Sequence, residues 1–246
     1  MTAQKSVLTG AEPDRGYLEC EKPWVFALLM CVGGFLGAFT YSIRGGVFCN
    51  AQTGNFVLLA MALGNGEWSR ALYYLIPMSA YFLGAVVSES IAGPIKKLNL
   101  IRWDTLFIMI EMAAIVFLGL LPESAPYQIT QVTVNFICSM QYNTFRQARG
   151  IPMATTFCTN HLRQVGVAFS KLLKHRDPSH AVRLFSHLLM LAFFVAGGVV
   201  STVLCRLFLG RAVFASLIPL AVVLAGLLRA DLKKEKGSLE QVPRGH

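Results

Sequence analysis

Long apolar runs constrain the fold of this chain more than any other feature. A helix needs roughly 20 mostly apolar residues to cross a bilayer, and four runs suit that purpose: 24–43, 71–92, 106–121 with its flanks, and 185–209. Two more runs, 127–145 and 212–228, are also candidates, although the first is polar on one side. Only 14% of the residues are charged, whereas a typical soluble domain has about 25%. The sequence therefore predicts an all-α integral membrane protein.

Charged residues and cysteines argue against several other classes of protein. The formal net charge is +9, but Lys and Arg cluster beside the apolar runs, where they set membrane orientation, so we expect no nucleic-acid partner. The six cysteines lack the paired spacing and the nearby histidines of a metal site or a disulfide framework. Catalytic and phosphate-binding motifs are absent as well. We therefore expect neither an enzyme nor a bound metal or cofactor.

Two further stretches are apolar overall but carry polar residues at their centres. The first, RGGVFCNAQTGNFVLLAMALGNG at 44–66, has this central polar group: Asn50, Gln52, Thr53, Gly54 and Asn55. The second, GIPMATTFCTNHLRQVG at 150–166, has a corresponding group: Thr155, Thr156, Thr159, Asn160 and His161. Polar backbone and side chains at membrane depth are tolerated only where protein buries them or where they line a water-filled cavity.

Internal similarity relates the two polar centres. Thr53 aligns with Thr159, and Asn55 aligns with His161. Further along the chain, GAVVS at 84–88 aligns with GGVVS at 197–201 in the same order. These matches predict two membrane repeats, 24–121 and 122–230, flanked by a polar N-terminal tail at 1–23 and a polar C-terminal tail at 231–246.

Basic residues indicate how the two polar-centred segments enter the membrane. Short cytoplasmic loops are rich in Lys and Arg, and the bias is strongest when segments 47–64 and 154–173 each return to the side they entered. The resulting prediction is about six full transmembrane helices plus two re-entrant or broken half-helices in an inverted repeat. Both termini are then cytoplasmic. Seven or eight full spans are the alternatives.

Each re-entrant segment is expected to contain a short helix that begins near the membrane centre. Thr53 or Asn55 can cap a helix from about residue 56, and Thr159 or Asn160 can cap one from about residue 162. A helix N-terminus carries roughly half a positive charge and free N–H donors. Two such ends facing one cavity would attract an anion or a polar solute rich in acceptors. In the alternative interpretation, these groups only satisfy one another where two broken helices meet.

Two further polar features lie in the predicted spans. Gln128, Gln131, Asn135, Ser139 and Tyr142 fall along one face of the helix predicted at 127–145, where they could line a pathway or hydrogen-bond between helices. Glu111 lies deep in another predicted span. A carboxylate there is costly, so Glu111 is a candidate for proton coupling or a counter-ion, with a buried arginine pair as the alternative.

The residues GGFLGAFTYSIRGGVFCNAQTGN at 33–55 resemble the YoaK-type family of uncharacterised multi-spanning bacterial inner-membrane proteins. That family is marked by a Thr-Gly-Asn motif, here 53–55, and by a later Met-Gln-x-Asn stretch, here 140–143, before a second threonine-rich motif. The second motif departs from the family pattern at Asn160 and His161, and Gly37 stands where the family tends to have Asp. The resemblance implies a bacterial inner-membrane location and adds Gln141 to the candidate site.

The predicted function is a transporter or channel for a small anionic or polar solute bound between two half-helix N-termini near the midplane. The alternative is a non-transporting membrane scaffold or sensor. The expected partners are membrane lipid and the solute, and a homodimer is left open.

Overall fold

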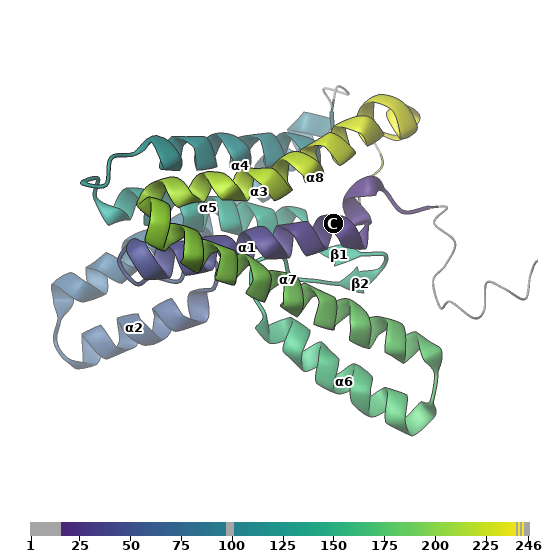
Figure 1. Ribbon diagram of the computed structural model, residues 1–246, viewed down its shortest axis with the longest axis horizontal. Helices are drawn as coiled ribbons and strands as arrows, with labels where there is room; N and C mark the ends of the chain where they lie inside the picture. The colour runs from purple at the N-terminus through teal and green to yellow at the C-terminus, as the bar shows by residue number, and fades with distance from the viewer. Residues whose placement is uncertain (1–15, 97–100, 240, 242, 244–246) are drawn as a thin grey trace, which may run out of the picture.

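The computed structural model describes residues 16–96, 101–239, 241 and 243, and most of these residues are helical (Figure 1). The α-helices are α1 Pro23–Ile43, α2 Gln52–Gly64, α3 Trp68–Lys96, α4 Trp103–Leu120, α5 Tyr127–Thr144, α6 Thr159–His175, α7 Pro178–Phe208 and α8 Leu217–Arg229. Short helical turns are η1 Glu19–Glu21, η2 Leu209–Ser216, η3 Ala230–Lys234 and η4 Lys236–Ser238. Strands β1 Gln147–Ala148 and β2 Ile151–Pro152 form a small antiparallel hairpin.

Several helices have the length and composition of membrane spans. Among the described residues, four stretches qualify: Pro23–Ile43, Trp68–Ile91, Trp103–Leu120 and Pro178–Lys234. The last has 57 residues and reverses direction at η2, so α7 and α8 run in opposite directions (Figure 1). α5 is too polar to qualify, as its sequence indicated. The predicted all-α membrane fold is confirmed at this level.

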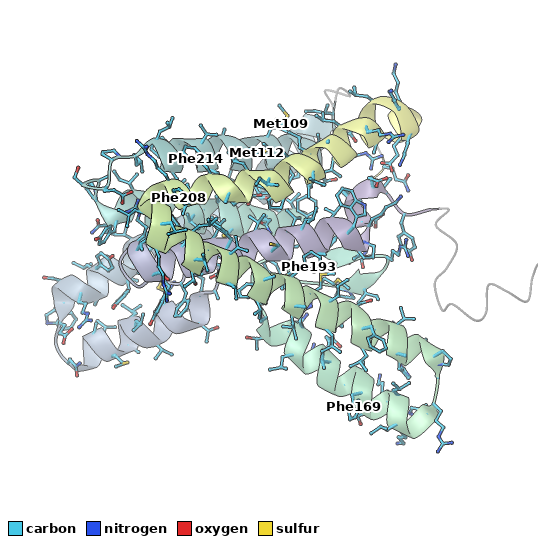
Figure 2. The ribbon with its side chains drawn as sticks, viewed as in Figure 1. Met109, Met112, Phe169, Phe193, Phe208 and Phe214 are labelled. Carbon is cyan, nitrogen blue, oxygen red and sulfur yellow. The ribbon has the colours of Figure 1, made fainter. Side chains whose placement is uncertain are left out.

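The distribution of side chains suits a lipid environment. Large apolar side chains are exposed on the outer faces of the helices, including Phe169 of α6 and Phe208 of α7 (Figure 2). Many polar side chains are instead fully buried inside, as the next subsection describes. Lipid solvates the apolar exterior, while polar groups at membrane depth are satisfied within the protein.

Two close helix crossings hold the centre of the molecule together. A Cβ added at Gly34 of α1 would lie 1.9 Å from the Phe194 carbonyl oxygen of α7, and one at Gly197 would lie 1.9 Å from the Cys31 carbonyl oxygen of α1. At the other crossing, a Cβ at Gly84 of α3 would lie 2.4 Å from the Phe136 carbonyl oxygen of α5. Small residues let helix backbones approach closely in membranes, so these glycines set the crossings α1 on α7 and α3 on α5.

One end of the molecule is tied together by Glu123, in the turn between α4 and α5. Its carboxylate accepts from the Arg44 guanidinium over 2.9 Å and from the Gly210 N–H over 2.7 Å. Arg44 follows α1, and Gly210 belongs to η2. The run predicted at 212–228 is helical throughout: residues 209–216 form the 3-10 helix η2, which meets Glu123, and α8 begins at Leu217.

The opposite end contains a second ion-pair cluster, which includes residues from both predicted tails. Asp231 is buried and accepts from the Arg102 N–H over 3.1 Å and from the Thr105 hydroxyl over 2.6 Å. Glu235 lies 3.2 Å from Arg102, and Glu19 lies 3.3 Å from Lys234. Residues 19–21 and 230–238 thus pack on the helices, because their acids find basic partners there. Residues 1–15 of the predicted N-terminal tail lie outside the described part.

Candidate functional site

Helices α2 and α6 are short and point toward opposite ends of the molecule (Figure 1). α2 has 13 residues and α6 has 17. At 1.5 Å per residue these lengths are about 20 and 25 Å, less than the roughly 30 Å of a bilayer core. α2 turns back into α3, and α6 turns back into α7, so each forms a hairpin with the longer helix that follows it.

Both helices begin earlier than predicted, and without the predicted caps. α2 begins at Gln52 after Ala51, and α6 begins at Thr159 after Cys158; neither preceding side chain caps its helix. The prediction that Thr53, Asn55, Thr159 or Asn160 caps these helices was wrong. The physical reason is visible at Asn55, whose side chain is already engaged by the segment before the helix.

The segments before α2 and α6 meet in the interior. Asn50 is buried, and its amide donates to the Thr156 carbonyl over 2.9 Å and to the Gly33 carbonyl over 3.0 Å. A Cβ at Gly33 would lie 2.7 Å from the Thr155 carbonyl oxygen, and one at Gly37 would lie 2.6 Å from the Asn50 amide nitrogen. The two glycines of α1 therefore provide the space in which both polar centres lie against this helix.

The same side chain-to-backbone bridge occurs in both polar centres. Asn55 donates to the Phe48 carbonyl over 2.8 Å and accepts from the Phe48 N–H over 3.2 Å. His161 Nε2 lies 2.8 Å from the Ala154 carbonyl oxygen. Each bridge reaches back seven residues, and Asn55 and His161 are the residues that the sequence alignment paired. Phe48 and Ala154 take part in these bridges through their backbone groups only. Because their side chains are apolar, the sequence did not indicate them as site residues.

His161 also contacts a second histidine, which the sequence argument had left out of the site. Its Nδ1 lies 2.9 Å from Nδ1 of His187 on α7, and both rings are buried. A carbonyl oxygen only accepts, so His161 donates from Nε2 to Ala154. With both rings neutral, His161 Nδ1 is then an acceptor and His187 Nδ1 is the donor. This pair fixes α6 to α7.

The polar face of α5 packs against the first polar centre. Gln52 donates to the Asn135 side-chain oxygen over 2.7 Å, and Asn135 donates to the Gln131 carbonyl over 2.7 Å. Gln131 in turn donates to the Arg44 carbonyl over 2.7 Å and to the Tyr73 hydroxyl. Asn135 and Gln131 are fully buried. Gln131 and Asn135, on the polar face of α5, therefore make contacts between helices.

Near the second polar centre, buried polar atoms lack partners. Gln141 donates weakly to the Leu29 carbonyl over 3.4 Å and to the Thr155 carbonyl over 3.3 Å. Its side-chain oxygen and the Thr155 hydroxyl have no hydrogen-bond partner in the part of the chain that the structure describes. Both side chains are fully buried. Unsatisfied buried polar groups cost free energy, and they are the groups that a polar ligand can satisfy.

Four predicted site residues lie away from this buried centre. Thr53 and Thr159 are exposed, and Gly54 is half-buried with Phe48 beside it. Asn160 is half-buried, and its side chain accepts from Arg163 over 3.0 Å. The structure therefore brings together another subset of the predicted residues: Asn50, Gln52, Asn55, Asn135, Gln141, Thr155, Thr156 and His161.

Glu111 is fully buried in α4, and neither of its carboxylate oxygens has a hydrogen-bond partner among residues 16–96 and 101–239. The predicted alternative of a buried arginine pair finds no support there. Cys138 of α5 is near enough to interact electrostatically both with Glu111 and with Cys49, the residue before Asn50. Glu111 thus lies behind the first polar centre.

A cavity of about 300 Å³ leads toward the second polar centre from the surface. Its walls include Ala154 and Asn160 beside the start of α6, together with Tyr142 and Arg146. Arg146 pairs with Glu89, which is largely exposed. The cavity is large enough for a small solute, and its lining reaches Ala154, the residue before the buried Thr155.

Comparison with known proteins gives one match. A family model described as "Protein of unknown function (DUF1275)" matches residues 25–227. Searches of curated proteins and of solved structures gave no match.

Proposed function

Since the chain belongs to the DUF1275 family, whose description states no function, we propose a function from the geometry of its own centre: a membrane transporter or channel for a small anionic or polar solute. One observation carries the proposal. Two short helices begin beside a shared buried centre, where Asn50 of one entrance segment is hydrogen-bonded to Thr156 of the other.

The proposed membrane topology has six full spans, α1, α3, α4, α5, α7 and α8, with α2 and α6 as re-entrant half-helices from opposite faces. Their lengths and opposite directions support it. So does the equivalent bridging by Asn55 and His161, which suits two inverted repeats, 24–121 and 122–230. Transporters of this architecture bind solutes near the midplane, between discontinuous helices.

The proposed orientation places both termini in the cytoplasm of a bacterial inner membrane. Lys22, Arg102 and Lys234 cluster with acids at one end, the end toward which α6 and its basic turn run. Short cytoplasmic loops favour such basic residues. The cavity beside Ala154 and Asn160 would then open toward the cytoplasm.

An anionic or acceptor-rich solute suits the groups that surround the centre. The N-terminal ends of α2 and α6 carry partial positive charge and have no side-chain cap. Arg146 lines the cavity wall as well, paired with Glu89. The unpartnered Thr155 hydroxyl is a buried donor for such a solute, whereas the unpartnered Gln141 side-chain oxygen accepts only and requires a donor group on the solute.

The alternative proposal is a non-transporting scaffold or sensor. The observation that favours it is the close packing at the junction, where Asn50 and Asn55 already make hydrogen bonds to backbone. In that case the polar centres would serve to join the two halves, and no solute would reach Thr155.

A stability screen with a matched pair of variants tests the choice between these functions. A ligand that binds the folded state raises stability by RT ln(1 + [L]/Kd), so purified protein is screened with small anions and neutral polar solutes. Thr155→Val removes a hydroxyl that makes no hydrogen bond, so folding should survive while the ligand-induced shift is lost. Thr133→Val, at a half-buried position of α5 whose hydroxyl bonds to its own helix, should keep the ligand-induced shift. If the ligand still raises the stability of Thr155→Val, the proposed site is excluded. If no solute raises the stability of the wild type, the scaffold function is favoured.

A further inference from the structure

A second cavity, of about 520 Å³, lies away from the meeting point of the half-helices. It is bounded by the end of α6, the start of α7, the β1–β2 hairpin and Pro23 at the start of α1. Among the described residues, its polar lining contains three cations, three hydroxyl groups and a histidine, and no acid: Tyr17, Arg149, Lys171, Ser179, His180, Arg183 and Ser186. Such a lining favours an anion.

The basic residues of this cavity differ from others at the same end of the molecule. Arg102, Lys234 and Lys22 each pair with an acid. Lys171 and Arg183 form no ion pair within the described ranges 16–96 and 101–239. Their charge is therefore available to a ligand.

The turn of the β-hairpin is built to bring Arg149 to the cavity. Arg149 and Gly150 have φ of 46° and 75°, the left-handed conformation of a tight hairpin turn. The Arg149 N–H donates to the Glu21 carbonyl over 2.9 Å, which fixes the turn to η1. The cavity wall is thus held by contacts between segments far apart in the chain.

The acidic residue Asp177 lies next to the cavity, but its carboxylate is hydrogen-bonded to Ser179. Asp177 precedes α7, and its carboxylate accepts from the Ser179 N–H over 2.9 Å and from the Ser179 hydroxyl over 2.7 Å. These hydrogen bonds lower the pKa of the Asp177 carboxyl. Ser186 and the cations Lys171 and Arg183 are therefore the groups best placed to bind an anion.

The surroundings of the cavity suit a ligand with an apolar part. Ile151, Met153 and Val182 complete the lining. The same two helices also carry exposed phenylalanines, Phe169 on α6 and Phe185 on α7 (Figure 2 labels Phe169). A phosphate oxyanion could bind Lys and Arg by charge-assisted hydrogen bonds, while an attached acyl chain contacts the apolar face of the hairpin.

We propose that this cavity binds a phosphate group, carried either by an anionic phospholipid or by a soluble phosphate ester. A membrane-surface cation contributes about 1 kcal/mol to binding an anionic lipid. Removing two cations should therefore weaken binding by more than about tenfold. The proposal is independent of the transport function, because it concerns binding at a separate cavity.

The test uses the full-length protein in detergent and measures the rise in its unfolding temperature. The additives are phosphatidylglycerol, phosphatidylcholine, glycerol phosphate and inorganic phosphate. Lys171→Gln with Arg183→Gln removes two lining charges. Lys174→Gln with Arg176→Gln removes two charges from the same basic region, at residues that do not line the cavity.

Phosphatidylglycerol, and not phosphatidylcholine, should stabilise the wild type and the Lys174/Arg176 variant, with a loss of more than about tenfold in affinity in the Lys171/Arg183 variant. If glycerol phosphate or inorganic phosphate gives the same saturable, variant-sensitive shift, the ligand source is soluble. The proposal is overturned if both double variants respond alike to every additive, if phosphatidylcholine stabilises the wild type as strongly as phosphatidylglycerol does, or if no additive stabilises the wild type.

Discussion

The side chain of Asn50 donates to the backbone carbonyl of Thr156 over 2.9 Å, and the two residues are 106 positions apart in the chain. The same separation relates Asn55 to His161, which make equivalent bridges in the two polar centres. Residues at matching positions of the two halves therefore contact each other directly in the interior. This contact supports the proposed arrangement of two inverted repeats.

Asn50→Ala should weaken the junction between the halves. The change removes two buried hydrogen bonds, to Gly33 and to Thr156, and should lower the free energy of unfolding by about 1–3 kcal/mol. Detergent-induced unfolding of the purified protein measures the loss. Asn65→Ala, at the exposed turn after α2, is the control and should be near neutral. Equal stability of the two variants would contradict this role of Asn50.

Gly197→Ala should disrupt the crossing of α1 and α7, whereas Gly198→Ala should be tolerated. A Cβ at Gly197 would lie 1.9 Å from the Cys31 carbonyl oxygen, but at Gly198 the nearest atom is 3.6 Å away. Overpacking of this kind costs typically about 1–3 kcal/mol. Comparing the unfolding temperatures of the two variants tests this prediction. Similar temperatures would mean that α1 and α7 do not cross at Gly197.

Stability should fall in acid through Glu123. Partial burial alone would raise the pKa of this carboxyl, but hydrogen bonds from Arg44 and Gly210, with the charges of Arg44 and Arg211, lower it below 4.5. Because the pKa of Glu123 is lower in the folded state, its contribution to stability is fully present above pH 4.5. The contribution is lost as the pH falls through the folded-state pKa.

The measurement compares wild type and Glu123→Gln across this pH range. Since the Glu123 side chain is 46% exposed, solvent screening limits the effect to about 0.5 kcal/mol. The variant should be the less stable protein at neutral pH, and the difference should shrink in acid. A difference that stays constant with pH would exclude the ion pair as its source.

Glu111→Gln should preserve the fold and remove any coupling to protons. The carboxylate has no hydrogen-bond partner in the described residues, so an amide of the same shape should change stability by less than about 1 kcal/mol. In proteoliposomes, a proton gradient should drive accumulation of the screened solute in wild type and in Glu67→Gln, a control at an exposed turn. Accumulation that persists in Glu111→Gln would remove Glu111 from the mechanism.

The sequence predicted the positions of the long helices because an apolar run of sufficient length is a local property. The predicted runs 24–43, 71–92 and 106–121 correspond to α1, α3 and α4 within a few residues. It also located both polar centres, since a cluster of amides and hydroxyls inside an apolar segment stands out by composition alone.

What the sequence could not predict depends on contacts between distant segments. Arg44 is paired with Glu123, 79 residues away, and His161 with His187 on another helix. The capping prediction failed for the same reason: residue type suits Asn55 to a helix N-terminus, but its side chain is bound to the backbone of Phe48 instead. The local sequence does not show whether the Asn55 amide caps a helix or binds the backbone of Phe48.

The account depends most directly on α2 and α6 entering the membrane from opposite faces, and cysteine labelling measures this. In a variant without the six native cysteines, Glu67→Cys reports the turn after α2, and Lys174→Cys reports the end of α6, both at exposed positions. In intact cells, a membrane-impermeant maleimide should label position 67. Position 174 should react only after the membrane is opened. Labelling of both positions from the same side would contradict the account.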